Sequence, residues 1–400
     1  MRPESLSNRF APDTRSSADT SATSLSSMMS RLLGSRLQSW SDGWYEWRNR
    51  LLADPDFHRK ARRNPFMRLV ARKRARQMFD LCAGFVYSQV LASCVELDLF
   101  ERLAEGPRHR DWIANQTGLE TESADVLLRS AVSLKLLEKR GEDTYGLGIH
   151  GAALRANPGV TSMVQHHAFF YRDLKDPVSL LRNEQQETML SAFWDYSREE
   201  AASASQAHYS ELMHASQTMV AEQIIESHPL RAYQRLMDVG GGDGTFLRSV
   251  AQSAPDLDRV LFDLPAVVDR CRQTPDAAPR PIECHGGNMF DDPLPSGADI
   301  ISLVRVIHDH DDDQALALLT RCHAALPPGG SILLAEPMAV EDVGDPASDA
   351  YFGFYLHAMR RGRPRTPTEL KSLLQQAGFV RSVEVKTHLP MLVRMLVARA

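Results

Sequence analysis

The residues with the clearest chemical potential surround a glycine-rich turn in the second half of the chain. The run Leu236–Thr245, with the sequence LMDVGGGDGT, places an acid, Asp238, shortly before glycines at 240, 242 and 244. A short apolar run precedes the turn and an apolar-periodic segment follows it, which is typical of a buried strand, a tight turn and a helix N-terminus. Glycine lets a ligand approach the bare backbone at such a turn.

The spacing of these glycines indicates the class of ligand. A dinucleotide-binding turn has the pattern G-x-G-x-x-G, whereas this chain has G-x-G-x-G with Thr245 where the third glycine would stand. An acid beside the turn would repel a pyrophosphate and attract a cation. S-adenosylmethionine (SAM) carries an ammonium and a sulfonium and no phosphate. We therefore predict that Asp238, Gly240 and Gly242 contribute to a SAM site; an ordinary strand-to-helix turn is the alternative for the motif alone.

Further polar residues follow the predicted strands at the sheet edge where ligands bind in such folds. Asp263 ends the second strand, 19 residues after Gly244, where its carboxylate can accept both ribose hydroxyls. Asn288 and Met289 follow the third strand, and their amide and thioether could pair with an adenine edge and pack on its face. Arg305, in the fourth predicted strand, completes the expected cofactor contacts.

Two residues could form a base and its orienting partner. His308 ends the fourth predicted strand and Glu336 ends the fifth. If these strands are neighbours, the carboxylate can fix the imidazole tautomer and raise its basicity, so we predict that both residues are catalytic. The run His308–Asp313, HDHDDD, also resembles a metal cluster. We expect no metal, because Asp311–Asp313 are better explained as caps of the following helix.

Composition and cysteine use indicate a globular cytoplasmic protein. The 400-residue chain has a net charge of −5, so nothing draws it as a whole to nucleic acid. Its 5 cysteines lack any C-x-x-C spacing and are expected to be reduced thiols. No apolar run approaches the ~18 residues of a spanning helix, and the start lacks a signal-peptide core. Contact with the inner or photosynthetic membrane from the cytoplasmic side stays open.

The N-terminal part is expected to contain a disordered segment and then a helical arm. Residues 1–35 are rich in Ser, Thr and Ala, which predicts disorder. Residues 36–76 form the arm: Trp40, Trp44 and Trp47 stand at helical spacing, and nine Lys or Arg with no acid lie between positions 58 and 76. The arm could pack on a partner subunit beside solvated charge. The alternative is a peripheral membrane contact, with tryptophans at the interface and cations over anionic headgroups.

Residues 77–158 predict a winged-helix domain. Arg110–Gly118 and Ala124–Leu137 are the expected helices of a helix-turn-helix, and Lys139–Leu147 is the expected wing. Such domains often bind DNA, which makes a SAM-sensing or DNA-binding regulator the alternative of a different class. However, the second helix begins among Glu120, Glu122 and Asp125, which repel phosphates. We therefore expect dimerisation and no nucleic acid.

The rest of the chain divides into connecting helices and a catalytic domain. Residues 159–230 contain many aromatic residues and are expected to be either core helices or the lid of an apolar pocket. In residues 231–400 strands alternate with helices, which predicts an α/β doubly wound sheet ending in an antiparallel hairpin. The expected strands are Arg235–Val239, Arg259–Asp263, Pro281–His285, Asp299–Ile307, Ser331–Glu336, Ser382–Thr387 and Met391–Ala398.

Six motifs in one order resemble the SAM-dependent O-methyltransferases of the plant caffeic-acid type and their bacterial relatives. They are DVGGGDG (Asp238–Gly244), FDLP (Phe262–Pro265), GNMF (Gly287–Phe290), IHD (Ile307–Asp309), LAEP (Leu334–Pro337) and GRPRT (Gly362–Thr366). The resemblance covers about residue 80 to the C-terminus. It implies a Rossmann-like class I methyltransferase domain, an N-terminal winged-helix dimerisation domain and a homodimer. It also implies that His308 is the general base, that Glu336 orients it and that Asp263 holds the ribose.

Three departures from the family pattern affect the expected site. Asn288 stands where the family has Asp, and His310 stands where a Trp is common. Pro364 occupies the place of a second carboxylate, so we expect Glu336 to act without a second acidic partner.

Within this family the chain most resembles the bacterial enzymes of carotenoid synthesis that methylate hydroxyneurosporene and demethylspheroidene. The segments that carry this likeness are Phe169–Leu174 with Asp176-Pro177, Phe193-Trp194, and Tyr355–Met359 before Gly362–Arg365. The resemblance implies methylation of a tertiary hydroxyl on a long polyene. A tetrapyrrole or a small phenol is the alternative substrate, because motifs of the cofactor site do not report on the acceptor.

Overall fold

The computed structural model describes residues 42–184, 186–194, 216–341 and 344–400. The predicted disordered segment 1–35 lies outside the described residues, as does Trp40. The chain divides into two compact units, Met1–Val86 and Tyr87–Ala400. All five cysteines lie within the described residues and are free thiols, as expected.

The described part of the first unit is helical. It comprises a helix at 42–53, α2 (Pro55–Arg63) and the beginning of α3 (Pro65–Glu96), which continues into the second unit. α2 and α3 both begin with proline, which has no N–H to leave unsatisfied at a helix start. By length and composition α3 could cross a membrane, and 11% of its apolar window is buried inside the protein. The expectation that no apolar segment is long enough to span a membrane is therefore wrong. Scattered polar residues interrupt the apolar residues of α3, but they do not lower its mean hydropathy enough to exclude it.

The second unit begins with the predicted winged-helix arrangement. α5 (Arg110–Thr117) and α6 (Thr121–Ser133) are followed by a hairpin of β2 (Leu137–Gly141) and β3 (Thr144–Leu147), and β1 (Arg108–His109) pairs with β3. Gly118 ends α5 in a left-handed conformation, as a turn between two helices requires. The short helices α4 (Leu99–Arg102) and α7 (Ile149–Arg155) pack against each other beside this domain.

A group of helices follows the winged-helix domain. They are α8 (Pro158–Asp173), α9 (Pro177–Leu181), α10 (Met189–Phe193), a helix at 216–227 and the turn η1 (Leu230–Ala232). The Asp173 carboxylate at the end of α8 accepts the N–H groups of Met189 and Leu190, at 2.7 and 2.9 Å, and so fixes the start of α10. α8 and α10 also pack on α15 (Gly353–Met359), so these three helices form one aromatic cluster, which we call the helical cap.

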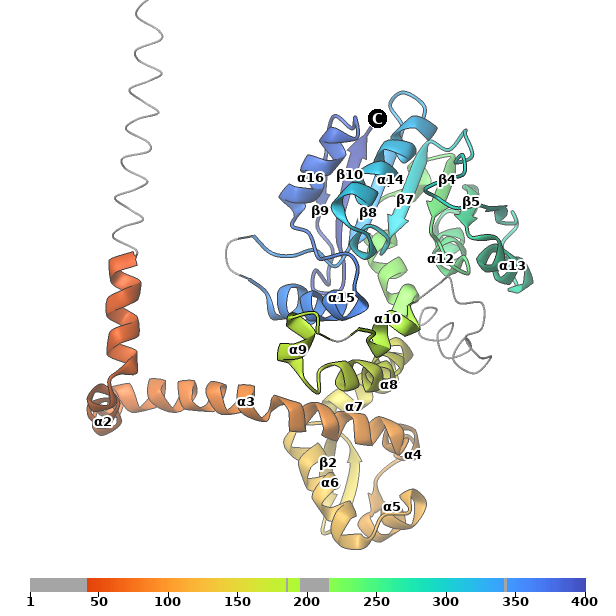
Figure 1. Ribbon diagram of the computed structural model, residues 1–400. Coiled ribbons are helices and arrows are strands. Elements are labelled where there is room, and N and C mark those ends of the chain that lie inside the picture. The colour runs from red at the N-terminus through yellow and green to blue at the C-terminus, as the bar shows by residue number, and fades with distance from the viewer. Residues whose placement is uncertain (1–41, 185, 195–215, 342–343) are drawn as a thin grey trace, which may run out of the picture. The chain divides into compact units, whose positions relative to one another are not determined.

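The catalytic domain contains a seven-stranded sheet in the order β6-β5-β4-β7-β8-β10-β9 (Figure 1). Its strands are β4 (Arg235–Val239), β5 (Asp258–Asp263), β6 (Glu283–Gly286), β7 (Ile300–Val304), β8 (Ser331–Glu336), β9 (Val383–Val385) and β10 (Arg394–Arg399). The first five are parallel, and β10 runs antiparallel to β8 and β9. The predicted α/β class and the terminal antiparallel pair are confirmed.

The sheet is buried on both faces, which explains its nearly continuous apolar strands. In β7, Ile301 and Leu303 enter one core, whereas Ile300 and Val304 enter the other. Helices α14 (Asp312–Ala325) and α16 (Pro367–Gln376) contribute to the first core, and α12 (Thr245–Ser253) and α13 (Pro265–Gln273) to the second. Two short helical turns, η2 (Ile307–Asp309) and η3 (Pro346–Phe352), follow β7 and precede α15.

Candidate active site

The glycine turn, residues 240–244, connects the end of β4 to the start of α12. Gly240, Gly242 and Gly244 have φ angles of +71°, +63° and +83°, in the region that favours glycine. A Cβ on Gly240 would lie 2.9 Å from a methyl group of Val306. The turn therefore exposes backbone rather than side chains where β4 and β7 end side by side.

Asp263 ends β5 and directs its carboxylate toward this turn. Its oxygens accept the N–H groups of Gly242 and Leu264 at 2.8 and 2.7 Å. Burial raises the pKa of Asp263, and these two hydrogen bonds and the charge of Arg270 partly oppose the shift. Ribose binding by this residue stays a prediction, and its place at the end of β5 agrees with that role.

Asp238 lies beneath the glycine turn. The Ser302 hydroxyl donates to its Oδ1 at 2.6 Å, while among the described residues Oδ2 has no hydrogen-bond partner. A Cβ on Gly241 would lie 2.3 Å from Oδ2, so the carboxylate fills the space under the turn. Complete burial raises the pKa of Asp238 to about 7. The structure thus places this acid behind the glycine turn, and its contribution to a cofactor site stays a prediction.

Asn288 and Met289 follow β6 on the same side of the sheet. The Asn288 amide donates to Asp291 Oδ2 at 2.6 Å, and its oxygen accepts the Phe290 N–H at 3.0 Å. Both ends of the amide thus bond within their own turn, and each keeps one further N–H or lone pair with which to pair with adenine. The half-buried Met289 is free to pack on a flat ring.

Arg305 has a φ of +57°, which is unusual for a residue with a side chain. Its N–H donates to the Ala335 carbonyl at 2.8 Å, and its Nη1 donates to Ser216 Oγ at 3.0 Å. These bonds hold a strained backbone in place and bring a positive charge to the edge of the sheet.

His308 and Glu336 meet at the adjacent ends of β7 and β8, as predicted from the sequence. Nδ1 of the buried imidazole is hydrogen-bonded to Glu336 Oε2, and Glu336 Oε1 accepts the N–H groups of Val306 and Ile307 at 3.1 and 2.8 Å. Burial alone lowers the pKa of His308. The carboxylates of Asp309 and Glu336 outweigh this effect, so the pKa lies above its ordinary value.

Asp309 is a second acidic partner of this imidazole. Its Oδ1 lies 3.1 Å from Nε2 of His308. The expectation that Glu336 acts without a second carboxylate is therefore wrong. The helical turn η2 folds Asp309 back onto its neighbour, so this acid comes from the residue after His308 rather than from the position of Pro364.

The GRPRT segment holds the backbone on both sides of His308. Arg365, 2% exposed, donates to the carbonyls of Ile307 and His310 at 2.9 and 2.7 Å and pairs with Asp312 at 2.7 Å. Gly362, with φ of +69°, approaches so closely that a Cβ there would lie 1.9 Å from the His308 carbonyl oxygen. Together, Arg365 and Gly362 fix the backbone position of His308 and therefore the position of its imidazole.

These elements surround one cavity of about 310 Å³. Its lining includes Gly240, Gly242, Asp263, Asn288, Met289, Arg305, His308 and Asp309 from the sheet edge, and Trp194, Phe352, Tyr355, Leu356, Met359 and Arg361 from the helical cap and its neighbourhood. Of the predicted site residues, only Asp238 and Glu336 do not line it. Within the described part of the chain, no three His, Cys, Asp or Glu side chains are arranged to hold a metal ion.

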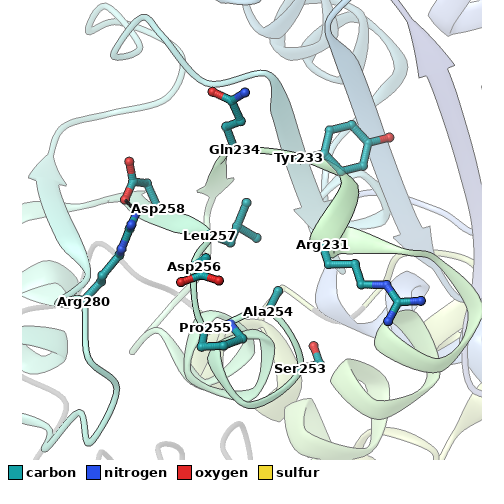
Figure 2. Close-up of a pocket in the computed structure, with 10 residues that line it drawn as sticks. All are labelled: Arg231, Tyr233, Gln234, Ser253, Ala254, Pro255, Asp256, Leu257, Asp258 and Arg280. Carbon is teal, nitrogen blue, oxygen red and sulfur yellow. Dashed lines mark hydrogen bonds and ion pairs between the residues drawn. The ribbon is translucent and has the colours of Figure 1, made fainter.

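A second hollow, of about 470 Å³, lies at the amino ends of β4 and β5 (Figure 2). Tyr233 and Gln234, just before β4, and Asp258, at the start of β5, line it, and Arg280 pairs with Asp258 there at 2.6 Å. Because parallel sheets bind ligands at the carboxyl ends of their strands, the cavity beside His308 is the candidate active site.

The sheet order, the glycine turn and the buried imidazole–carboxylate pair together define a class I methyltransferase. Residues 171–380 match the O-methyltransferase domain family, and residues 79–153 match the O-methyltransferase dimerisation domain. The chain belongs to this family and is a SAM-dependent O-methyltransferase. The predicted fold class, enzyme class and cofactor are confirmed.

Among curated relatives, the chain is similar to two enzymes named demethylspheroidene O-methyltransferase. It is 42% identical to that of Cereibacter sphaeroides, covering 82% of this chain and 88% of the relative, and 40% identical to that of Rhodobacter capsulatus, covering 87% and 88%. Human acetylserotonin O-methyltransferase is 30% identical over 76% of this chain and 92% of the relative.

Solved structures agree with the fold. Human N-acetylserotonin methyltransferase in complex with SAM superposes with a TM-score of 0.70 at 26% identity, covering 81% of this chain and 97% of that one. The pyocyanin biosynthetic protein PhzM also gives 0.70, at 25% identity, covering 82% and 99%.

The residues of the cavity fit SAM. Glycine backbone and the Asp263 carboxylate offer acceptors for its amino and hydroxyl groups, and Met289 offers a surface for its base. The sequence did not reveal the roles of Asp309 and Arg365, although both stand in motifs. It also could not show that Trp194 and Tyr355, 161 positions apart, meet at the wall of the cavity.

The clamp on the His308 loop leads to a testable prediction. Arg365→Lys keeps the charge but replaces the three guanidinium nitrogens that bond Asp312 and the two carbonyls with one ammonium nitrogen, so we expect turnover to fall at least about tenfold through misplacement of His308. SAM affinity, measured by calorimetry, should stay unchanged. The matched control is Arg363→Lys, because among the described residues Arg363 pairs only with Asp312 and Glu369 and is 43% exposed. Equal losses in both variants would contradict the clamp.

Proposed function

We propose that this enzyme methylates the tertiary hydroxyl of a hydroxylated carotenoid with His308 as general base. The observation that carries the catalytic part is the buried imidazole that faces the same cavity as the glycine turn. The substrate is inferred from the 40–42% identity to demethylspheroidene O-methyltransferases. The relatives that are named for small aromatic acceptors are less similar, at 26–30% identity.

When bound, SAM supplies a methyl group on a positively charged sulfur. The protein must align an acceptor oxygen with that methyl and remove the hydroxyl proton. His308 Nδ1–H is held by Glu336, which leaves Nε2 as the atom that takes the proton. A tertiary alcohol is far less acidic than imidazolium, so proton removal is concerted with methyl transfer and contributes about 10²–10⁴-fold.

Asp309 controls this step. Its Oδ1 occupies the position next to Nε2 that the substrate hydroxyl needs, at 3.1 Å. The acceptor hydroxyl must therefore replace Asp309 as the partner of Nε2. Until then the two carboxylates favour the charged form of the imidazole, which cannot accept the hydroxyl proton.

His308→Gln tests the base directly. Incubation with methyl-labelled SAM and a hydroxylated carotenoid, followed by mass measurement of the product, should show a methyl ether with the wild type. The variant should lose at least about 10²-fold in turnover and keep its SAM affinity. Near-normal turnover in the variant would reject the base. No product with the wild type, despite SAM binding, would reject the substrate.

Asp309→Asn is the companion variant. It removes a negative charge that raises the pKa of His308, so that pKa should fall. Because the neutral imidazole is the active form, the rising limb of the pH–activity profile should shift to lower pH in this variant. An unchanged or upward-shifted limb contradicts the assigned role of Asp309.

We infer that the chain forms a homodimer through its N-terminal domain. The matched dimerisation family begins at residue 79, and α3 there carries exposed apolar side chains: Phe79, Leu81, Phe85 and Val86 are 63%, 78%, 71% and 45% exposed. A second copy of the chain would remove this surface from water. Sedimentation equilibrium should give twice the mass of 44.7 kDa, and a purely monomeric species would contradict the inference.

We also infer that the arm before residue 77 contacts an anionic membrane surface from the cytoplasm. Phe66, Leu69 and Val70 share one face at the start of α3 and are 86%, 69% and 50% exposed. Five cations stand among and after them, at Arg68, Arg72, Lys73, Arg74 and Arg76. Neither matched family covers this arm, and a lipid-soluble substrate resides in the bilayer. Apolar anchors with interleaved cations fit anionic headgroups.

Co-sedimentation with vesicles tests this contact. The full chain should bind vesicles of phosphatidylglycerol and phosphatidylcholine, bind vesicles of phosphatidylcholine alone weakly, and lose binding as salt rises. Changing Phe66, Leu69 and Val70 to Ser should remove the binding. Val380→Ser, at a residue 80% exposed in the catalytic domain, should not. Equal binding by all variants, or none by the wild type, rejects the membrane contact.

A further inference from the structure

The wall of the cavity opposite the sheet edge contains a buried aromatic hydrogen-bond chain. Trp194 follows α10 and Tyr355 lies in α15, and both line the cavity. The Trp194 indole Nε1–H donates to the Tyr355 hydroxyl at 2.8 Å. That hydroxyl also lies 2.6 Å from Nε2 of His166, which is completely buried in α8.

The three rings are held in these positions by close packing. His166 lies 4.6 Å from the Phe193 ring and 5.6 Å from the Phe169 ring, measured between centroids. Phe170 contacts Tyr355 edge-on at 5.4 Å. Burial also raises the pKa of Tyr355 well above its ordinary value, so its hydroxyl stays neutral. The Tyr355 hydroxyl and the Trp194 N–H are thus both hydrogen-bonded within the helical cap.

A second pair of the same types stands beside the first and does not line the cavity. Nε2 of His167 bonds to the Tyr351 hydroxyl at 2.7 Å. Tyr351 stacks on Tyr355 with a centroid distance of 6.0 Å and an interplanar angle of 25°. The chain therefore carries two neighbouring His–Tyr pairs with similar chemistry, of which only one borders the substrate space.

We propose that the His166–Tyr355–Trp194 chain determines specificity for an apolar acceptor, by keeping the polar atoms of the wall bonded to each other so that the cavity presents hydrocarbon there. The inference rests on the proposed function and assigns these residues to acceptor recognition. None of them touches the reacting atoms in this role. They determine which kind of substrate skeleton can lie beside the hydroxyl that His308 deprotonates.

The physical reason is whether water must bind to the polar groups of the wall. In the intact wall, no water is needed to satisfy the Tyr355 hydroxyl or the Trp194 N–H. If the chain is broken, water from the cavity would bond to the exposed polar group. A hydrocarbon substrate would then have to displace that water without replacing its hydrogen bonds, which weakens binding. The methyl-transfer step itself would be unaffected, because the hydrogen bonds found for these three residues in the described part of the chain do not include His308, Glu336 or Asp309.

Four single variants in the full-length chain test the proposal. Tyr355→Phe removes the hydroxyl at the centre of the hydrogen-bond chain. His166→Leu removes the partner of that hydroxyl without changing a residue that lines the cavity. The matched controls, Tyr351→Phe and His167→Leu, break the neighbouring pair. The first readout is the Kd for a polyene hydrocarbon without a hydroxyl, delivered in detergent micelles and followed by quenching of tryptophan fluorescence. The second is the KM and kcat of methyl transfer to the hydroxylated carotenoid.

We expect Kd and KM to rise about tenfold in Tyr355→Phe and His166→Leu, with kcat within about twofold of the wild type. Both controls should stay within about twofold on every measure. Melting temperature and SAM affinity, measured for all four variants, identify any that fail to fold; either of the first two suffices for the test. Wild-type Kd in both chain variants, or equal losses in chain and control variants, overturns the proposal. Tight hydrocarbon binding without methyl transfer would instead reject the proposed function alone.

Discussion

The burial of the His308 imidazole between two carboxylates is the interaction on which the site depends. A charged pair removed from water is costly unless each partner is fully hydrogen-bonded. Here Glu336 accepts two backbone N–H groups with one oxygen and the imidazole with the other, and Asp309 approaches the second ring nitrogen. Arg365 then fixes the carbonyls on both sides of the histidine. The result is an imidazole whose two nitrogens both face carboxylates and whose position is fixed by the backbone around it.

The cavity joins two surfaces of opposite character. The sheet edge supplies carboxylates, bare glycine backbone and a guanidinium, which suit a polar and charged cofactor. The helical cap supplies aromatic rings whose polar atoms bond to one another, which suits a hydrocarbon. The fold separates these surfaces because the first comes from parallel strand ends, whereas the second comes from α8 and α10, which precede the sheet in sequence, and from α15, which lies between β8 and β9. Cofactor binding and acceptor choice can therefore vary independently.

Much of the fold could be predicted from local patterns. The run at 235–239, the glycine turn after it and the strand at 331–336 were predicted at the bounds that the structure has, because apolar strands buried on both faces and glycine turns have strong signals. Two expectations failed. The apolar residues of α3 are spread over 32 residues with no continuous apolar run, and no second acid is expected beside Glu336 because position 364 is proline, although a helical turn brings Asp309 to His308.

The α/β architecture and the class of cofactor follow from the sequence alone, as does the meeting of His308 with Glu336, because these depend on residues at the ends of predictable strands. Only the tertiary structure decided which groups act on that pair. Arg365 lies 58 positions from the carbonyl of Ile307 that it bonds, and Tyr355 lies 189 positions from His166. Contacts at such separations depend on how helices pack rather than on local spacing, and no periodicity in the chain records them. The motifs therefore indicate the chemistry of the reaction, whereas the shape and polarity of the acceptor space depend on how the helices pack.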